Sequence, residues 1–276
     1  MQLGVPKEIK AQEFRVGMTP AGVRELVRAD HSVLIESGAG DAIGLTDDLY
    51  RAAGASVVET AEQVFAESDM VVKVKEPQPH ECRRLRPGQL LFTYLHLAAD
   101  PLQAELLMNS GATCIAYETI TSPKGGLPLL APMSLVAGRL SVQAGAHHME
   151  IHQGGNGTLL GGVPGVAPGK VLVLGGGVVG SSAIRVALGM GADVTVLDRS
   201  VSRLGELDEQ YRGQLRTVYS TAEALEEHVS EADLIIGAVL IPGASAPKLI
   251  TAEMLADVKP GTVMVDVAID QGGCFE

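Results

Sequence analysis

The sequence contains no tryptophan, few other aromatic residues and only three cysteines. Cys82, Cys114 and Cys274 are widely spaced and lie outside any C-x-x-C pattern. This spacing excludes a disulfide framework and a cysteine-based zinc site. We expect the three residues to be ordinary thiols, and we predict no metal site.

Basic charge is also scarce, because 33 acidic side chains outnumber 21 basic ones and give a formal net charge of −12. Nucleic acids and anionic membranes require clustered Lys and Arg, so the composition excludes both partners. No apolar run reaches the ~18 residues of a membrane helix, and the N-terminus lacks the basic and apolar regions of a signal peptide. These absences predict a cytoplasmic protein.

Apolar strands that alternate with amphipathic helices run through the whole chain, which is typical of parallel sheets covered by helices on both faces. A length of 276 residues favours two lobes, which we place at residues 1–130 and 131–276. A helix over residues 132–149 is predicted to connect them. The predicted fold class is therefore α/β, with two doubly wound Rossmann-like lobes and a cleft between them. The predicted strands cover residues 3–5, 32–36, 70–74, 90–94, 113–117, 171–174, 194–197, 216–219, 234–239 and 263–268, and two further helices cover residues 21–28 and 101–109.

A glycine turn between a strand and a helix is the strongest functional signal. Gly175 permits a tight turn out of the strand, Gly177 lets the backbone approach a pyrophosphate, and Gly180 lets helix and strand pack closely. The phosphates would lie at the helix N-terminus, where N–H groups favour an anion. Asp198 ends the next strand and is placed to accept hydrogen bonds from ribose hydroxyls. The order of these parts predicts a dinucleotide site that prefers NAD to NADP.

Two alternatives to this interpretation stay open. A chain with 33 glycines can contain a G-x-G-x-x-G pattern that serves only as a tight turn. Arg199 and Arg203 follow the acid and could instead accommodate the 2′-phosphate of NADP. The carboxylate of Asp198 favours NAD, because it would repel that phosphate.

Polar side chains also follow several predicted strands at their carboxyl ends. Lys75 and His96 do so in the first lobe, and Ser220 and Asp270 do so in the second. Each residue alone is more often a solvated loop residue. Because ligands of open α/β sheets gather beyond the carboxyl ends of strands, the four together indicate a site.

The motifs of the chain, in order, resemble those of the alanine dehydrogenase and pyridine nucleotide transhydrogenase family. The resemblance begins in the opening segment from Lys7-Glu8 through Glu13-Phe14-Arg15-Val16 to Pro20 and covers essentially the whole chain. The other motifs that carry it are Val72-Lys73-Val74-Lys75-Glu76-Pro77, Phe92-Thr93-Tyr94-Leu95-His96-Leu97, Pro132-Met133-Ser134, Gly175 to Gly180, and Val265-Asp266-Val267-Ala268-Ile269-Asp270-Gln271-Gly272-Gly273.

This resemblance implies an NAD-dependent, reversible oxidative deamination of L-alanine to pyruvate and ammonium. It implies that Arg15 and Lys75 bind the substrate and that His96 and Asp270 are catalytic. It also implies which residues line the NAD, although Val239 and Leu240 could equally be ordinary strand core. These residues are Ser134, Asp198, Arg203, Ser220, Val239, Leu240, Val267, Ala268, Ile269 and Asp270.

Members of the family continue beyond the position of Glu276, so the resemblance implies a first lobe that lacks its C-terminal completion. Many members are hexamers, which predicts a homo-oligomer, a hexamer if full length. A second interpretation is the soluble NAD(H)-binding component of a proton-translocating nicotinamide nucleotide transhydrogenase. A third is a chain that binds NAD but is catalytically silent.

Overall fold

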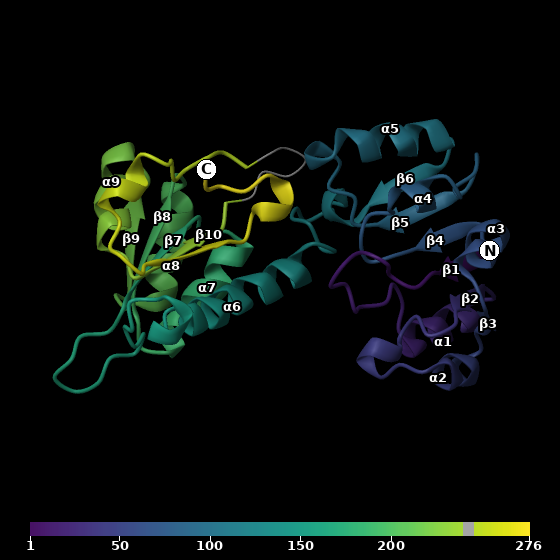
Figure 1. The fold of residues 1–276 in the computed structure, drawn as a ribbon, viewed down its shortest axis with the longest axis horizontal. Helices are drawn as coiled ribbons and strands as arrows, with labels where there is room; N and C mark the ends of the chain where they lie inside the picture. Colours follow the sequence, from purple (N-terminus) through teal and green to yellow (C-terminus); the bar gives the residue numbers. More distant parts are fainter. Residues whose placement is uncertain (240–245) are drawn as a thin grey trace. The chain divides into compact units, whose positions relative to one another are not determined.

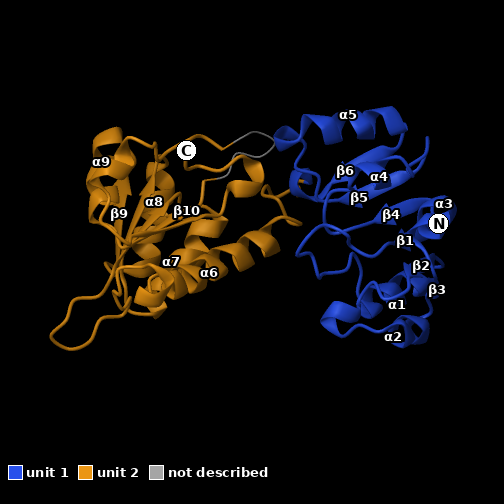
Figure 2. Ribbon diagram, in the orientation of Figure 1, with its two compact units in different colours: residues 1–120 blue, residues 121–276 orange. Residues whose placement is uncertain are grey.

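A computed structural model describes residues 1–239 and 246–276 of the chain. The chain divides into two compact units, Met1–Ile120 and Thr121–Glu276 (Figure 2). The helix predicted over residues 132–149 is α6 (Ala131–His148). The helix lies wholly within the second unit because it packs on α7 (Val178–Gly189) and on strands of the second sheet.

The first unit contains a six-stranded sheet in which every neighbouring pair is parallel. Its strand order, β3-β2-β1-β4-β5-β6, is that of a doubly wound nucleotide-binding fold, with the direction of winding changing between β1 and β4 (Figure 1). The strands are β1 (Gln2–Val5), β2 (Ser32–Glu36), β3 (Ser56–Val58), β4 (Met70–Val72), β5 (Leu90–Thr93) and β6 (Thr113–Ala116).

The helices of the first unit begin and end where local chemistry dictates. The Thr19 side chain accepts a hydrogen bond from the Gly22 N–H at the start of α1, and Asp100 caps α5 in the same way. Gly111, in the left-handed conformation, ends α5. The α-helices are α1 (Pro20–Arg28), α2 (Asp47–Ala53), α3 (Ala61–Glu67), α4 (Pro79–Cys82) and α5 (Pro101–Ser110), and the 3-10 helices are η1 (Asp41–Ile43), η2 (Leu97–Ala99) and η3 (Tyr117–Thr119).

The second unit contains a five-stranded parallel sheet of order β11-β10-β7-β8-β9, with its change of winding between β7 and β10. The strands are β7 (Lys170–Leu174), β8 (Asp193–Asp198), β9 (Leu215–Tyr219), β10 (Leu234–Gly237) and β11 (Val263–Asp266). Besides α6 and α7, its helices are α8 (Val201–Tyr211), α9 (Ala222–Glu231), η4 (Ile151–Gln153), η5 (Met254–Asp257) and η6 (Ile269–Gln271). Each unit thus consists of a doubly wound parallel sheet with helices, which confirms the predicted α/β fold class.

Close contact between α6 and α7 positions one side of the second unit. A Cβ at Gly138 of α6 would overlap the carbonyl oxygen of Val179 in α7. A Cβ at Gly145 would meet the Leu234 side chain of β10 at 2.5 Å. Ser134, in the first turn of the same helix, is buried. Glycine on the inner face of α6 thus lets the helix lie directly on the core.

Throughout the two described ranges, every helix is too short or too polar to cross a lipid bilayer.

Candidate functional site

Each unit contains a candidate site at the carboxyl ends of its strands. In the second unit the glycine turn leads from β7 into α7. Gly175 has a φ of 97°, a backbone conformation that residues with a side chain rarely adopt. A Cβ at Gly180 would overlap the Gly175 carbonyl oxygen, so only glycine allows α7 to approach β7 this closely. At Gly177, which directly precedes α7, a Cβ would meet no described atom within 4 Å. The turn therefore leaves room for a ligand beside the N-terminus of α7.

Asp198 lies at the end of β8, beside the glycine turn. Its Oδ2 accepts a hydrogen bond from the Gly176 N–H at 2.7 Å, and its Oδ1 accepts one from the Ser200 N–H at 2.8 Å. These bonds hold the carboxylate at the edge of the turn. A carboxylate in this place suits the ribose hydroxyls of a dinucleotide and opposes a 2′-phosphate.

Arg203 of α8 also contacts the glycine turn. Its Nε donates to the Gly176 carbonyl oxygen at 2.7 Å, and its Nη2 donates to the Ser181 hydroxyl at 2.6 Å. Its Nη1 forms an ion pair with Glu206. All three nitrogens thus contact the protein itself, an arrangement that favours a structural role over recognition of a phosphate.

A cavity of about 620 Å³ lies beside the glycine turn. This volume is in the range of small-molecule and cofactor pockets. Six of the residues predicted to bind the cofactor line it: Ser134, Gly175, Gly177, Asp198, Ser220 and Val239. Residues that the sequence reasoning missed also line it, among them Leu127, Leu130, Val178, Val179, Pro247 and Leu249. Arg199, which follows Asp198 and could accommodate the 2′-phosphate of NADP, also lines the cavity.

The remaining predicted cofactor residues follow β11. Ala268 is buried, whereas Ile269 and Asp270 are exposed on η6. The Asp266 side chain, missed from the sequence, organises this loop, because it accepts hydrogen bonds from the N–H groups of Ala268, Cys274 and Phe275. Leu240 lies outside the described residues. Gly180 directly follows Val179, which lines the cavity, and the Val267 N–H donates to the Gly237 carbonyl oxygen at 3.0 Å.

In the first unit, the residue predicted to bind a substrate carboxylate already contacts a carboxylate of the protein. Arg15 donates from Nε to Glu13 Oε1 at 2.8 Å and from Nη2 to Glu13 Oε2 at 2.5 Å. The backbone N–H of Arg15 also donates to Glu13 Oε1. The Arg15 side chain is 45% exposed and that of Glu13 only 7% exposed. Glu13, which the sequence reasoning did not single out, thus fixes one edge of the guanidinium.

Lys75 belongs to the same cluster. Hydrogen bonds from Arg15 lower the pKa of the Glu13 carboxyl below its usual value, and the positive charge of Lys75 contributes to the shift. The Lys75 carbonyl oxygen accepts a hydrogen bond from the Thr93 hydroxyl at 3.0 Å, which ties the residue to β5. The structure therefore places both Arg15 and Lys75 near enough to Glu13 for their charges to act on its carboxylate.

His96 follows β5 and has a left-handed backbone conformation, with a φ of 51°. The buried Glu118 side chain supports it, because Glu118 Oε1 accepts hydrogen bonds from the N–H groups of His96 at 2.7 Å and Leu95 at 3.1 Å. The imidazole stacks on the Tyr94 ring with centroids 6.1 Å apart. Its Nδ1 is buried and has no hydrogen-bond partner among the described residues. Burial raises the pKa of Tyr94, and the positive charge of Arg15 opposes this shift. Tyr94 thus stacks on His96 and also lies within the electrostatic influence of Arg15.

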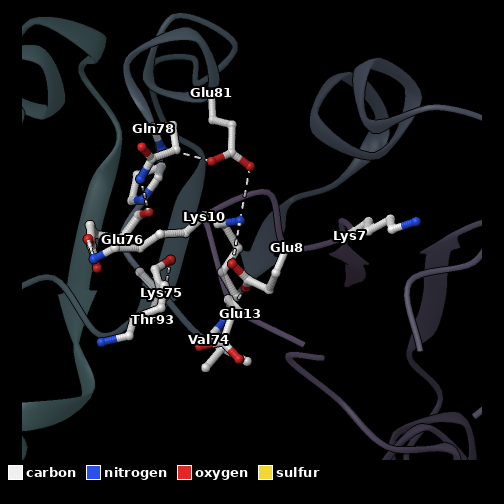
Figure 3. A network of polar contacts seen from close by, with 12 residues as sticks. Lys7, Glu8, Lys10, Glu13, Val74, Lys75, Glu76, Gln78, Glu81 and Thr93 are labelled. Atoms are coloured by element: carbon white, nitrogen blue, oxygen red, sulfur yellow. Dashed lines mark hydrogen bonds and ion pairs between the residues drawn. The ribbon is translucent and has the colours of Figure 1, made fainter. Parts of the chain in front are cut away.

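The first unit also contains a buried ion network, in which Glu8 and Glu81 take part (Figure 3). The Nζ of Lys73, which is fully buried, lies 3.1 Å from Glu8 Oε2 and 2.9 Å from Glu81 Oε1. The other oxygen of Glu8 accepts a hydrogen bond from the Val74 N–H, and that of Glu81 accepts one from the Gln78 N–H. Burial raises the pKa of Glu8 above its ordinary value. The network fixes the N-terminal segment to the chain that carries Lys75.

The comparisons with known proteins cover both units of the chain. Residues 4–137 match the family described as "Alanine dehydrogenase/PNT, N-terminal domain", and residues 141–276 match its "C-terminal domain" counterpart. The chain belongs to this family. The membership confirms the resemblance inferred from the motifs.

Relatives within the alanine dehydrogenase and transhydrogenase family differ in their distance from this chain. An alanine dehydrogenase from Halomonas elongata is 61% identical over 276 residues, which are 100% of this chain and 74% of that protein. A solved structure of L-alanine dehydrogenase has a TM-score of 0.91 at 54% identity, over 100% of this chain and 76% of its own. A solved transhydrogenase from Sinorhizobium meliloti has a TM-score of 0.82 at 28% identity, over 100% and 81%. The two alanine dehydrogenases are thus much more similar to the chain than this transhydrogenase is.

Proposed function

We propose that the protein is an oxidoreductase acting on a CH–NH2 group, which converts L-alanine reversibly to pyruvate and ammonium with NAD as its coenzyme. The observation that carries this proposal is the 61% identity to an alanine dehydrogenase over every residue of the chain. The cluster of Arg15, Lys75 and His96 in the first unit supports it, because the reaction needs an anion site and a proton carrier.

Arg15 and Lys75 bind the substrate in this proposal. A guanidinium is planar and suits the two oxygens of a carboxylate, so Arg15 holds the carboxylate of alanine or pyruvate. Lys75 is a compact positive charge and binds the same carboxylate or the carbonyl oxygen of pyruvate. The contact of Arg15 with Glu13 supports this role, because the guanidinium already pairs with a carboxylate through two of its nitrogens.

His96 is the general acid and base. An imidazole exchanges protons near neutral pH, and positioned proton transfer typically contributes about 10² to 10⁴ in rate. The buried Nδ1 of His96 lacks a partner among the described residues, which suits a nitrogen that a substrate or a water contacts during the reaction. Loss of the hydride converts the amine of alanine to an imine, which water must hydrolyse to give pyruvate and ammonium. Asp270, exposed on η6, orients and deprotonates the water that attacks this imine, and it stabilises the ammonium product.

The coenzyme site is the cavity beside the glycine turn. The open space at Gly177 and the N–H groups at the start of α7 suit the pyrophosphate, and Asp198 suits the adenosine ribose. Bound NAD would supply the acceptor for the hydride that leaves the substrate Cα. Ser134, Ser220 and Val239 line the same cavity and hold the rest of the molecule.

A transhydrogenase component is the second candidate function. The structural likeness to the transhydrogenase of Sinorhizobium meliloti favours it, because that likeness also covers the whole chain. Such a component exchanges hydride with NADP bound by a partner and turns over no amino acid. The cluster of Arg15, Lys75 and His96 favours the alanine dehydrogenase, since a component without an amino-acid substrate has no use for a carboxylate site.

The protein is further proposed to assemble as a homo-oligomer, and as a hexamer if full length. Large apolar side chains at Leu135, Val136 and Leu140 are exposed along α6, as are those of Leu159 and Val166 in the loop after η4. Exposed apolar surface of this kind is typical of an interface between protein molecules.

The decisive assay is NADH formation from L-alanine and NAD by the wild-type chain and by His96→Ala. We expect turnover by the wild type and a loss of about 10² or more in kcat for the variant. Wild-type activity in the variant would remove His96 from the mechanism. NAD binding without turnover, together with hydride exchange with an NADP-bearing partner, would favour the transhydrogenase component.

A further inference from the structure

The bidentate contact between Glu13 and Arg15 gives the first-unit site a property beyond the binding of a carboxylate. Glu13 contacts the edge of the guanidinium formed by Nε and Nη2, and its two oxygens accept from both. Its side chain is 7% exposed, so bulk water screens its charge only weakly. Glu13 is therefore a fixed negative charge within the site.

The local loop holds Glu13 in place. The Glu13 N–H donates to the Lys10 carbonyl oxygen, and Lys10 forms an ion pair with Glu76 (Figure 3). A Cβ at Gly17, on the other side of Arg15, would meet the Val72 carbonyl oxygen at 2.6 Å, so the segment lies directly against the end of β4. These contacts hold the segment on both sides of Arg15, and the Glu13 carboxylate with it.

The charges of the cluster add up simply. Arg15 and Lys75 contribute two positive charges and Glu13 one negative charge, which leaves one positive charge among the three groups. The pKa of Glu13 is lowered, mainly by the hydrogen bonds from Arg15, so its carboxylate stays ionised at neutral pH. Glu8, whose charge also acts on Arg15, forms its own ion pair with Lys73.

We propose that Glu13 determines specificity for monocarboxylic substrates, by orienting Arg15 and by opposing a second carboxylate at the site. Arg15, Lys75 and Glu13 together carry one net positive charge, which one substrate carboxylate neutralises. A substrate in which a carboxylate replaces the methyl group of pyruvate would bring a second negative charge toward the buried charge of Glu13. This inference rests on the function proposed above, because it takes Arg15 and Lys75 as the substrate site.

The test compares pyruvate with ketomalonate, the 2-oxo acid in which a carboxylate replaces that methyl group. Binding of each acid is measured by calorimetry, with NADH present and ammonium left out so that no turnover occurs. The proteins are the wild-type chain, Glu13→Gln, Glu13→Asp and Glu105→Gln. The measured quantity is the ratio of the two dissociation constants. Loss of local structure would weaken the binding of both acids together and leave this ratio unchanged.

We expect the wild type to prefer pyruvate, and Glu13→Gln to shift the ratio toward ketomalonate by on the order of tenfold, since it removes the opposing charge. Glu13→Asp keeps the charge, so its ratio stays near that of the wild type even where both affinities fall. Glu105→Gln removes a carboxylate from the exposed surface of α5 and leaves both affinities unchanged.

An unchanged ratio in Glu13→Gln overturns the inference, and so does a wild type that binds neither acid. Failure of the proposed function is observed separately, as absence of NADH formation from L-alanine in a wild-type chain that still distinguishes the two acids.

Discussion

Lys73 shows at the scale of one residue how this fold accommodates charge in its interior. Its Nζ contacts carboxylates of Glu8 and Glu81, and the side chains of all three residues are at most 2% exposed. Burial of one cation between two anions is stable only because further hydrogen bonds satisfy the remaining oxygens. The network stabilises the segment between β4 and α4, which includes Lys75.

Lys73→Met should destabilise the protein by about 3 to 5 kcal/mol, because it leaves two buried carboxylates without their cation. Chemical denaturation monitored by circular dichroism measures this loss. Arg28→Met is the matched control, since the ion pair of Arg28 with Glu25 is 70% and 73% exposed and should contribute at most about 1 kcal/mol. Equal effects of the two substitutions would contradict the importance of the buried network.

The carboxyl of Glu13 should make stability depend on pH. Its pKa in the folded protein is lower than the ordinary value of 4.5 because Arg15 donates hydrogen bonds to it. The unfolded chain therefore binds the proton more readily, and the stabilisation is present above pH 4.5 and lost as the pH falls through the lower folded value. We expect wild type and Glu13→Gln to differ most in free energy of unfolding above pH 4.5 and to converge in acid. A difference that grows on acidification would reverse the assigned sign.

Sequence patterns at this scale pointed to the residues that we propose to act directly, and missed residues that hold them in place. Arg15, Lys75 and His96 stood out because they follow apolar strands or carry a family motif. Glu13 and Glu118 did not, because their importance comes from hydrogen bonds to Arg15 and to the backbone of His96. Such partners depend on the path of loops, which local sequence does not determine.

At the scale of elements, the glycine turn of the second unit was predictable in detail. Gly175 and Gly180 each have a distinct steric reason, and a strand, a turn and a helix in this order have few alternative structures. The short elements β3 and α2 were not predicted, because a strand of three residues and a helix of seven leave little periodicity to detect. The strand predicted over residues 70–74 ends at Val72, because the chain turns toward the buried network at Lys73.

Gly180→Ala should separate α7 from β7, since the added methyl group would overlap the Gly175 carbonyl oxygen. Overpacking of this kind typically costs about 1 to 3 kcal/mol, and we also expect weaker NAD binding because the turn must move. Thermal unfolding and calorimetric titration with NAD measure the two effects. Gly189→Ala, at the other end of α7, meets no described atom within 4 Å and should be neutral or stabilising by about 0.4 to 1 kcal/mol. Comparable losses in both variants would remove the steric explanation.

At the scale of the whole molecule, two doubly wound parallel sheets, of six and five strands, carry different chemistry at their carboxyl ends. The first unit has two cations near the Glu13 carboxylate and an imidazole after β5, and the second has a glycine turn with an acid at the next strand. Family membership over residues 4–137 and 141–276 joins both sites in one protein. The reaction that we propose uses both sites: a hydride is removed from an amino acid that is held by its carboxylate.

Transfer of deuterium tests this claim most directly. The wild-type chain is incubated with NAD and L-alanine deuterated at Cα, and the NADH and pyruvate formed are analysed by mass spectrometry. We predict one deuterium in each NADH and equal amounts of NADH and pyruvate. NADH without deuterium, or bound NAD with no pyruvate at all, would contradict the account.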